Sequence, residues 1–113
     1  MKEFMMIFRN DKDEPKPSPE ELQGMLKQWD DWIGGIAAQE KFVATNALGF
    51  EGKTVNDKGV VSDGPYSEIK EIIGGYLICK TDTLEDAVAL TKGCPILANG
   101  GTVEVRDVMV FDV

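Results

Sequence analysis

The chain has 113 residues, 42% of them hydrophobic and 28% charged, which is the composition of a single globular domain spanning 1–113. Its net charge is −8, and the 12 basic residues are scattered among 20 acidic ones, which argues against nucleic-acid binding because nucleic acid requires a clustered positive face. The chain has no histidine and only two, distant cysteines, which excludes the usual zinc ligand sets, so we expect neither a metal nor a cofactor.

The sequence carries no membrane-targeting pattern. No apolar run approaches the roughly 20 residues of a membrane span. The apolar stretch 4–8 is too short for a signal peptide, and Arg9 closes it. We therefore expect a cytoplasmic protein with Cys79 and Cys94 as free thiols, the first buried in a strand and the second in a loop. A reactive thiol at Cys94 is disfavoured, because no histidine is available to activate it.

The N-terminal third predicts a strand and a long helix. Residues 1–9 carry apolar side chains at odd and even positions, which indicates an interior strand covered on both faces. Residues 10–17 are polar and contain two prolines, so we expect a loop there. Ser18 then caps a helix that has Pro19 at its first position and continues to about Gln39. The apolar stripe of this helix consists of Leu22, Met25, Leu26, Trp29, Ile33 and Ile36.

The middle of the chain predicts a strand, a hairpin and a short helix. Residues 41–48 form the second main strand, and 53–55 and 60–62 are the arms of a hairpin around the turn residues 56–59. Residues 67–73 have the composition of about two helical turns.

The C-terminal third completes the pattern. The glycine pair 74–75 is interpreted as the end of the short helix and a place of close backbone packing, before a third main strand at 75–80. Thr83 caps a second helix that ends at Gly93. A strongly β-branched last strand is expected at 103–111.

The main elements follow the order βαββαβ, with the hairpin and short helix inserted between the second and third main strands. This order matches an α+β fold of ferredoxin-like type, a sandwich of an antiparallel sheet with both helices on one face. The second face would then lack a cover, although several strands are apolar on both faces. Monomers avoid so large an apolar patch, so we predict a homodimer that forms through these sheet faces.

Asp63 to Tyr66 is the first candidate for chemistry. Its Asp-Gly-Pro order is typical of a turn, and in one interpretation Asp63 serves this turn while Tyr66 covers the core. In the other, Asp63 lines a pocket beside Lys70 and Glu71. There Lys70 would lower the pKa of a carboxylate and burial would raise it, which makes Asp63 and Glu71 candidate acid–base residues. By default, Lys70 and Glu71 on a short helix belong to a solvated face.

Arg106 is the second candidate. It alternates with Glu104 along the last strand, so the two side chains face the same way. The guanidinium fork suits a substrate carboxylate, and the competing interpretation is an ion pair with Glu104 or with an acid of a partner subunit.

Residues 61–71, with the sequence VSDGPYSEIKE, and the following Gly74-Gly75-Tyr76 resemble the DGPF signature of the YCII-related (DGPF-domain) family. Further segments that resemble the pattern of this family are 2–5, the helix around Trp29 and Trp32, 83–88, 93–95 and 101–106. The chain departs from the pattern at Tyr66, where the signature has Phe, and at Asp107, where many relatives have Pro.

The resemblance implies a dimeric α+β barrel in an intracellular, mostly bacterial protein of largely undefined role. Some relatives use a His-Asp pair as catalytic acid and base. Asp63 matches the aspartate of that pair, but no residue matches the histidine, so the resemblance does not carry catalysis over to this chain. Other relatives are linked to sigma-factor systems, which implies a regulatory or ligand-sensing role.

The sequence thus favours a homodimeric small-molecule-binding or regulatory module without catalysis. Its ligand, small and anionic or aromatic, is expected between sheet and helices, at Asp63, Tyr66, Lys70 and Arg106. One alternative is a lyase or isomerase that moves a proton next to a carbonyl, with Asp63 or Glu71 as base and Arg106 as anchor. Another is a protein-interaction subunit linked to transcriptional regulation, which the acidic composition favours.

Overall fold

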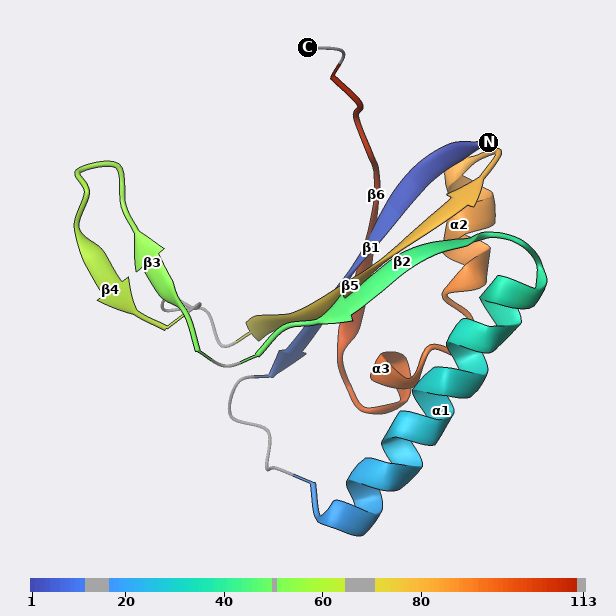
Figure 1. The fold of residues 1–113 in the computed structure, drawn as a ribbon, viewed down its shortest axis with the longest axis horizontal. Helices are drawn as coiled ribbons and strands as arrows, with labels where there is room; N and C mark the ends of the chain where they lie inside the picture. The colour runs from blue at the N-terminus through green and yellow to red at the C-terminus, as the bar shows by residue number, and fades with distance from the viewer. Residues whose placement is uncertain (12–16, 50, 65–70, 112–113) are drawn as a thin grey trace.

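A sheet of four antiparallel strands forms the centre of the molecule, with helices packed on one side (Figure 1). The computed structural model describes residues 1–11, 17–49, 51–64 and 71–111. The strands of this sheet are β1 (Lys2–Asp11), β2 (Phe42–Ala47), β5 (Glu71–Thr81) and β6 (Thr102–Asp107), in the spatial order β2-β5-β1-β6. The helices are α1 (Pro19–Ala38), α2 (Leu84–Leu90) and α3 (Pro95–Ala98). This order confirms the ferredoxin-like α+β fold.

Strand β1 lies between β5 and β6 and is apolar on both faces. Phe4, Met6 and Phe8 are buried on the helix side, with at most 4% of each side chain exposed. Met5 and Ile7 point to the opposite face and are half-buried. The predicted interior strand is therefore confirmed, whereas the described residues do not supply the cover expected on its second face. It runs two residues further than expected, through Asn10 and Asp11, because these two residues pair with the start of β5.

Helix α1 begins and ends where the capping residues predict. The Ser18 hydroxyl accepts a hydrogen bond from the Glu21 backbone N–H at 3.2 Å, and Gln39 is the C-cap. The predicted apolar stripe packs on the sheet in its C-terminal half, where Ile36 is buried. In its N-terminal half, Leu22 is 45% exposed and Leu26 is 56% exposed, so this part of the stripe does not join the core as expected.

Aromatic side chains join α1 to the sheet and to α2. Phe8 of β1, Trp29 and Trp32 form edge-to-face pairs with ring centroids 5.1 to 6.0 Å apart. The Trp32 indole N–H donates to the Leu90 carbonyl of α2 at 3.1 Å. This cluster fixes α1 and α2 on the same face of the sheet, which leaves the opposite face without a cover within the described residues.

The second helix also begins as predicted. The Thr83 hydroxyl accepts a hydrogen bond from the Asp86 backbone N–H at 3.1 Å, and Gly93 follows the helix with a φ of +84°. The loop expected around Cys94 is instead the N-cap of the short helix α3. Pro95 is the first residue of α3, because its fixed φ suits a first helical position.

The inserted hairpin forms a separate two-stranded sheet of β3 (Lys53–Val55) and β4 (Val61–Asp63). The first arm is as predicted, and the second begins one residue later. The turn residue Asn56 explains the register, since its side-chain oxygen accepts from the backbone N–H groups of Lys58 at 3.0 Å and Val60 at 2.9 Å. Gly59 supplies the positive φ of +79° that the turn requires.

One predicted helix and one predicted strand end are wrong. The sequence predicts a short helix at 67–73, but residues 71–73 belong to β5, and 67–70 lie outside the described residues. Pairing with Asn10 and Asp11 extends β5 over this segment, so the glycine pair lies inside a strand and does not end a helix. The last strand ends at Asp107 and not at Phe111, because the neighbouring strand β1 offers no further residues to pair with. The Val108 N–H still donates to the Glu3 carbonyl, and β1 begins at Lys2.

We predict that Gly75→Ala destabilises the fold and Gly74→Ala does so much less. A Cβ at Gly75 would lie 2.8 Å from the Asn46 carbonyl oxygen of β2, whereas at Gly74 it would lie 2.7 Å from the side-chain nitrogen of Asn10, which can rotate away. Backbone overpacking of this kind costs about 1–3 kcal/mol. Urea unfolding should therefore show the larger loss for Gly75→Ala, and equal losses would contradict the close approach of β2 and β5.

Candidate functional site

The predicted site residues fall in different places. Asp63 lies on the hairpin that follows β2, and Arg106 lies on β6, at the opposite edge of the main sheet. Glu71 is the exposed first residue of β5. Tyr66 and Lys70 lie outside the described residues. Within one chain the structure thus does not bring Asp63 and Arg106 together, and the shared site of these residues stays a prediction.

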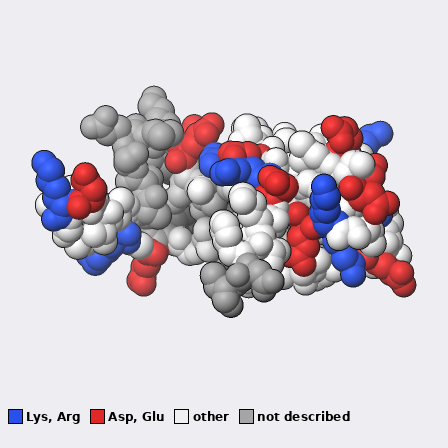
Figure 2. Space-filling model, turned by 90° about the horizontal axis from the view of Figure 1, so that it is seen from above, with Lys and Arg blue, Asp and Glu red and all other residues white. Residues whose placement is uncertain are grey.

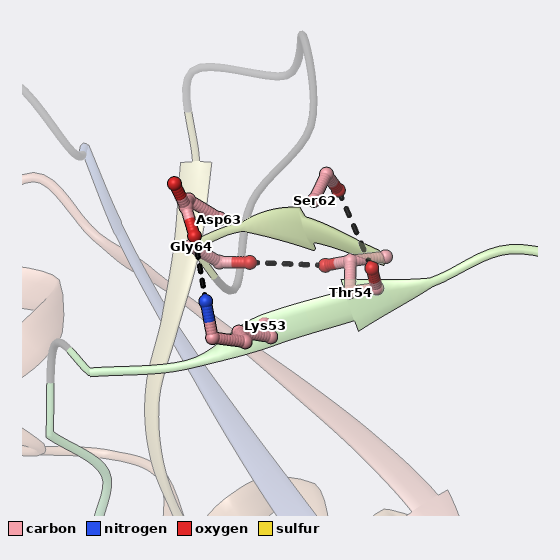
Figure 3. Close-up of polar contacts among 5 residues, drawn as sticks. All are labelled: Lys53, Thr54, Ser62, Asp63 and Gly64. Atoms are coloured by element: carbon pink, nitrogen blue, oxygen red, sulfur yellow. Dashed lines mark hydrogen bonds and ion pairs between the residues drawn. The ribbon is translucent and has the colours of Figure 1, made fainter. Parts of the chain in front are cut away.

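Asp63 forms an ion pair within the hairpin (Figure 3). Its carboxylate accepts a hydrogen bond from the Lys53 ammonium at 2.7 Å, and the Asp63 side chain is 96% exposed. On the other face of the hairpin, the Thr54 hydroxyl donates to the Gly64 carbonyl at 3.0 Å. An exposed pair of this kind contributes about 0–1 kcal/mol. Asp63 is thus the exposed last residue of β4, and its described cationic partner is Lys53.

A polar row crosses the uncovered face of the sheet. The strand register places Asn46 of β2, Tyr76 of β5, Ile7 of β1 and Glu104 of β6 side by side. At one end, the Asn46 amide donates to the Tyr76 hydroxyl oxygen at 2.9 Å. At the other end, the Arg9 guanidinium donates to Glu104 at 2.5 Å. Two hydrogen-bonded pairs, which together come from all four strands, thus lie on either side of the apolar Ile7.

The neighbouring row is apolar except for Arg106. It consists of Ala44, Ile78, Met5 and Arg106, in strand order. The Arg106 Nε lies 3.9 Å from the second carboxylate oxygen of Glu104, and its side chain is 69% exposed. The predicted pairing with Glu104 is therefore present but long, and the Arg106 side chain stays largely exposed. Glu104 lies between two guanidinium groups.

Sequence reasoning missed Arg9, Asn46 and Tyr76. Arg9 continues the outward-facing alternation of the first strand, and this spacing is a signal that could have found it. For Asn46 and Tyr76 no such signal exists, because the register between β2 and β5 decides that they meet.

Arg106 also lines a hollow of about 390 Å³ between β6 and the start of α2. The apolar part of its wall comes from Phe4, Leu84 and Val105, and its basic residues are Lys2 and Arg106. Asp82 and Asp107 also line it. The hollow can thus hold a small molecule with an apolar body and an ionic group. A second hollow of about 470 Å³ lies between α1 and α2, over Trp32 and Ile36.

The surface charge and the helices give further limits. Basic and acidic side chains lie interspersed on the face that Figure 2 shows. Among the described helices, none is both long enough and apolar enough to cross a membrane. In the described part of the chain, no group of three or more Cys, Asp or Glu side chains is placed to hold a metal ion.

Both thiols are buried and free. Cys79 is fully buried, and burial raises its pKa above the ordinary value. Cys94 is 2% exposed, and burial raises its pKa to about 11. A buried, protonated thiol is a poor nucleophile, so the environment of Cys94 is that of a core residue.

Comparison with known proteins places this geometry in a family. The model of the YCII-related domain matches residues 3–112. Among solved structures, the chain matches the 5-chloro-2-hydroxyhydroquinone dehydrochlorinase of Burkholderia phenoliruptrix AC1100 in complex with 2,5-dihydroxybenzoquinone. It is 15% identical, with a TM-score of 0.49 over 94% of this chain and 93% of that chain. No curated protein matches the sequence significantly.

We predict that Cys94 resists thiol reagents in the folded protein and reacts on unfolding. Its pKa is about 9.0 in the unfolded chain and about 11 in the folded chain, so folding favours the protonated thiol. The stability that this difference contributes is fully present below the lower pKa and is lost as the pH rises toward the higher one. Denaturant titrations across this alkaline range should show that the free energy of unfolding falls less with rising pH in Cys94→Ala than in the wild type. Rapid labelling of the native thiol at about pH 8 would contradict burial.

Proposed function

The chain belongs to the YCII-related family, and we propose that it acts as a homodimer that binds a small molecule. The family model covers nearly the whole chain, so it accounts for the fold and leaves the ligand open. The case for the dimer comes from exposed surface, and the case for the ligand comes from the hollow at Arg106.

The surface area of the chain carries the dimer proposal. The single chain exposes 8366 Å², whereas a monomeric protein of 12.4 kDa exposes about 6100 Å². The excess is about 2200 Å², which is within the range of roughly 1000–2500 Å² that each partner contributes to a permanent dimer. An excess of this size supports association with a second chain.

The uncovered sheet face favours a second copy of the chain as the partner. A twofold axis brings the same patch of both chains together, so the patch must be complementary to itself. Its centre, Met5, Ile7 and Ile78, is apolar and half-buried, and such a centre can pack on its own copy. Glu104 and Arg106 lie beside this centre with opposite charges, so each can face the other across the axis.

The hollow at Arg106 supports binding of a small carboxylate with an apolar or aromatic body. Arg106 and Lys2 are the basic residues of its lining, beside Asp82 and Asp107. Because β6 is an edge strand, the guanidinium of Arg106 can turn from the uncovered face toward this rim and offer its planar fork of donors. Phe4, Leu84 and Val105 provide an apolar wall for the rest of the molecule.

We predict that the wild-type protein has twice the chain mass of 12.4 kDa and that Ile78→Lys shifts it toward one chain mass. A lysine at the centre of an apolar contact leaves a buried, unpaired charge. Leu26→Lys is the matched control, since Leu26 is an exposed apolar residue of α1, away from the sheet face. Sedimentation equilibrium measures both masses. A wild-type protein that stays monomeric at all concentrations would contradict the proposal.

We predict that benzoate, a simple aromatic carboxylate, perturbs the amide resonances of Val105 and Arg106, and that the neutral analogue benzamide does so much less. The Arg106→Gln variant should bind benzoate about tenfold or more weakly, because it loses the charge-assisted pair. Lys27→Gln, which removes an equal charge on α1, is the control. Equal benzoate affinity in wild type and Arg106→Gln would show that Arg106 does not hold the ligand.

A further inference from the structure

The hairpin of β3 and β4 extends away from the rest of the molecule (Figure 1). Every residue from 51 to 63 is exposed, so no side chain of the hairpin packs into the core of its own chain. The radius of gyration is 15.7 Å, whereas a compact domain of this length has about 13 Å. The hairpin is thus an extended arm on an otherwise ordinary domain.

One face of the arm carries an apolar pair and a charged pair of side chains. Val55 and Val61 are directly opposite each other, and Lys53 and Asp63 form the next pair on the same side. The two valines are 62% and 54% exposed. The other side carries Thr54, whose hydroxyl bonds within the hairpin. Exposed valines on one face are what a contact surface requires, and the ion pair would rim it.

A two-stranded hairpin without a packed face is at best marginally stable in water. Hydrogen bonds from the Asn56 turn and the Lys53–Asp63 pair help, but each contributes little at an exposed site. The valine pair therefore needs a surface to pack against, and the described part of the chain does not supply one.

We propose that this hairpin is a dimerisation arm, whose Val55–Val61 face packs on the second copy of the chain. The inference rests on the homodimer proposed above and adds a second contact to its sheet-face contact. The excess surface of about 2200 Å² is larger than one small face is expected to bury, so the area leaves room for the arm within a permanent dimer. Because the twofold axis repeats the arm, the dimer would contain two such arm contacts.

The first test is the double variant Val55→Glu and Val61→Lys. It replaces the apolar pair with opposite charges that still face each other across the hairpin, so the hairpin itself is retained. The new Glu at 55 then lies next to Lys53 on β3 and the new Lys at 61 next to Asp63 on β4, so adjacent charges along each strand are opposite. The matched control is Leu22→Glu with Leu26→Lys, which removes two exposed leucines of α1 and adds a favourable pair at spacing i, i+4.

We expect the hairpin variant to raise the dimer dissociation constant about tenfold or more and the α1 control to leave it within about twofold. Sedimentation at a series of concentrations gives these constants. A wild-type dimer whose dissociation constant does not change in the hairpin variant would overturn the arm while the homodimer stands. A wild-type monomer would overturn the homodimer itself.

The second test uses the monomer that Ile78→Lys is designed to produce. Hydrogen exchange should show that the hairpin amides of Asn56 and Gly64 lose protection in this monomer, whereas the amides at the centre of β5 keep theirs. Hairpin amides that stay equally protected in monomer and dimer would mean that the arm is stable without a partner, which is the opposite of the proposal.

Discussion

The pairing of β1 with neighbours on both edges is the constraint on which the rest of the structure depends. Because β1 is apolar on both faces and central in the sheet, both faces of the sheet must be removed from water near its middle. The helices do this on one face, through Phe8, Trp29 and Trp32. The opposite face keeps half-buried apolar residues such as Met5 and Ile7, and this imbalance is the physical reason to look for a second copy.

Local signals predicted the elements whose structure depends on nearby residues. The Ser18 and Thr83 caps and the Asn56 turn each satisfy backbone N–H groups within four residues, so the sequence alone was sufficient. Where the partner is distant, the local signal failed. Residues 71–73 are a strand because Asn10 and Asp11 continue β1 beside them, and the last strand ends early because β1 offers no further partner. Strand length is thus set by the neighbour and not by propensity.

The candidate site shows the same division. Alternation along one strand was enough to place Glu104 and Arg106 on one face, and the structure agrees. The row that joins Asn46, Tyr76, Ile7 and Glu104 needs four strands in one register, and no pattern within a single strand contains that information. The α1 stripe failed for a related reason. Helical spacing shows which side of α1 is apolar, but the sheet ends before Leu22 and Leu26, so these two leucines stay exposed.

Glu104 joins the two arginines of the uncovered face, Arg9 and Arg106. No histidine is present, and the Glu104 oxygens already face the guanidinium groups of Arg9 and Arg106. A carboxylate in that position orients its cations. The Arg106 side chain is 69% exposed, and Arg106 also lines the hollow between β6 and α2, whose wall is partly apolar. An exposed arginine beside a partly apolar wall supports the binding role proposed above, in which Arg106 would hold a negative group.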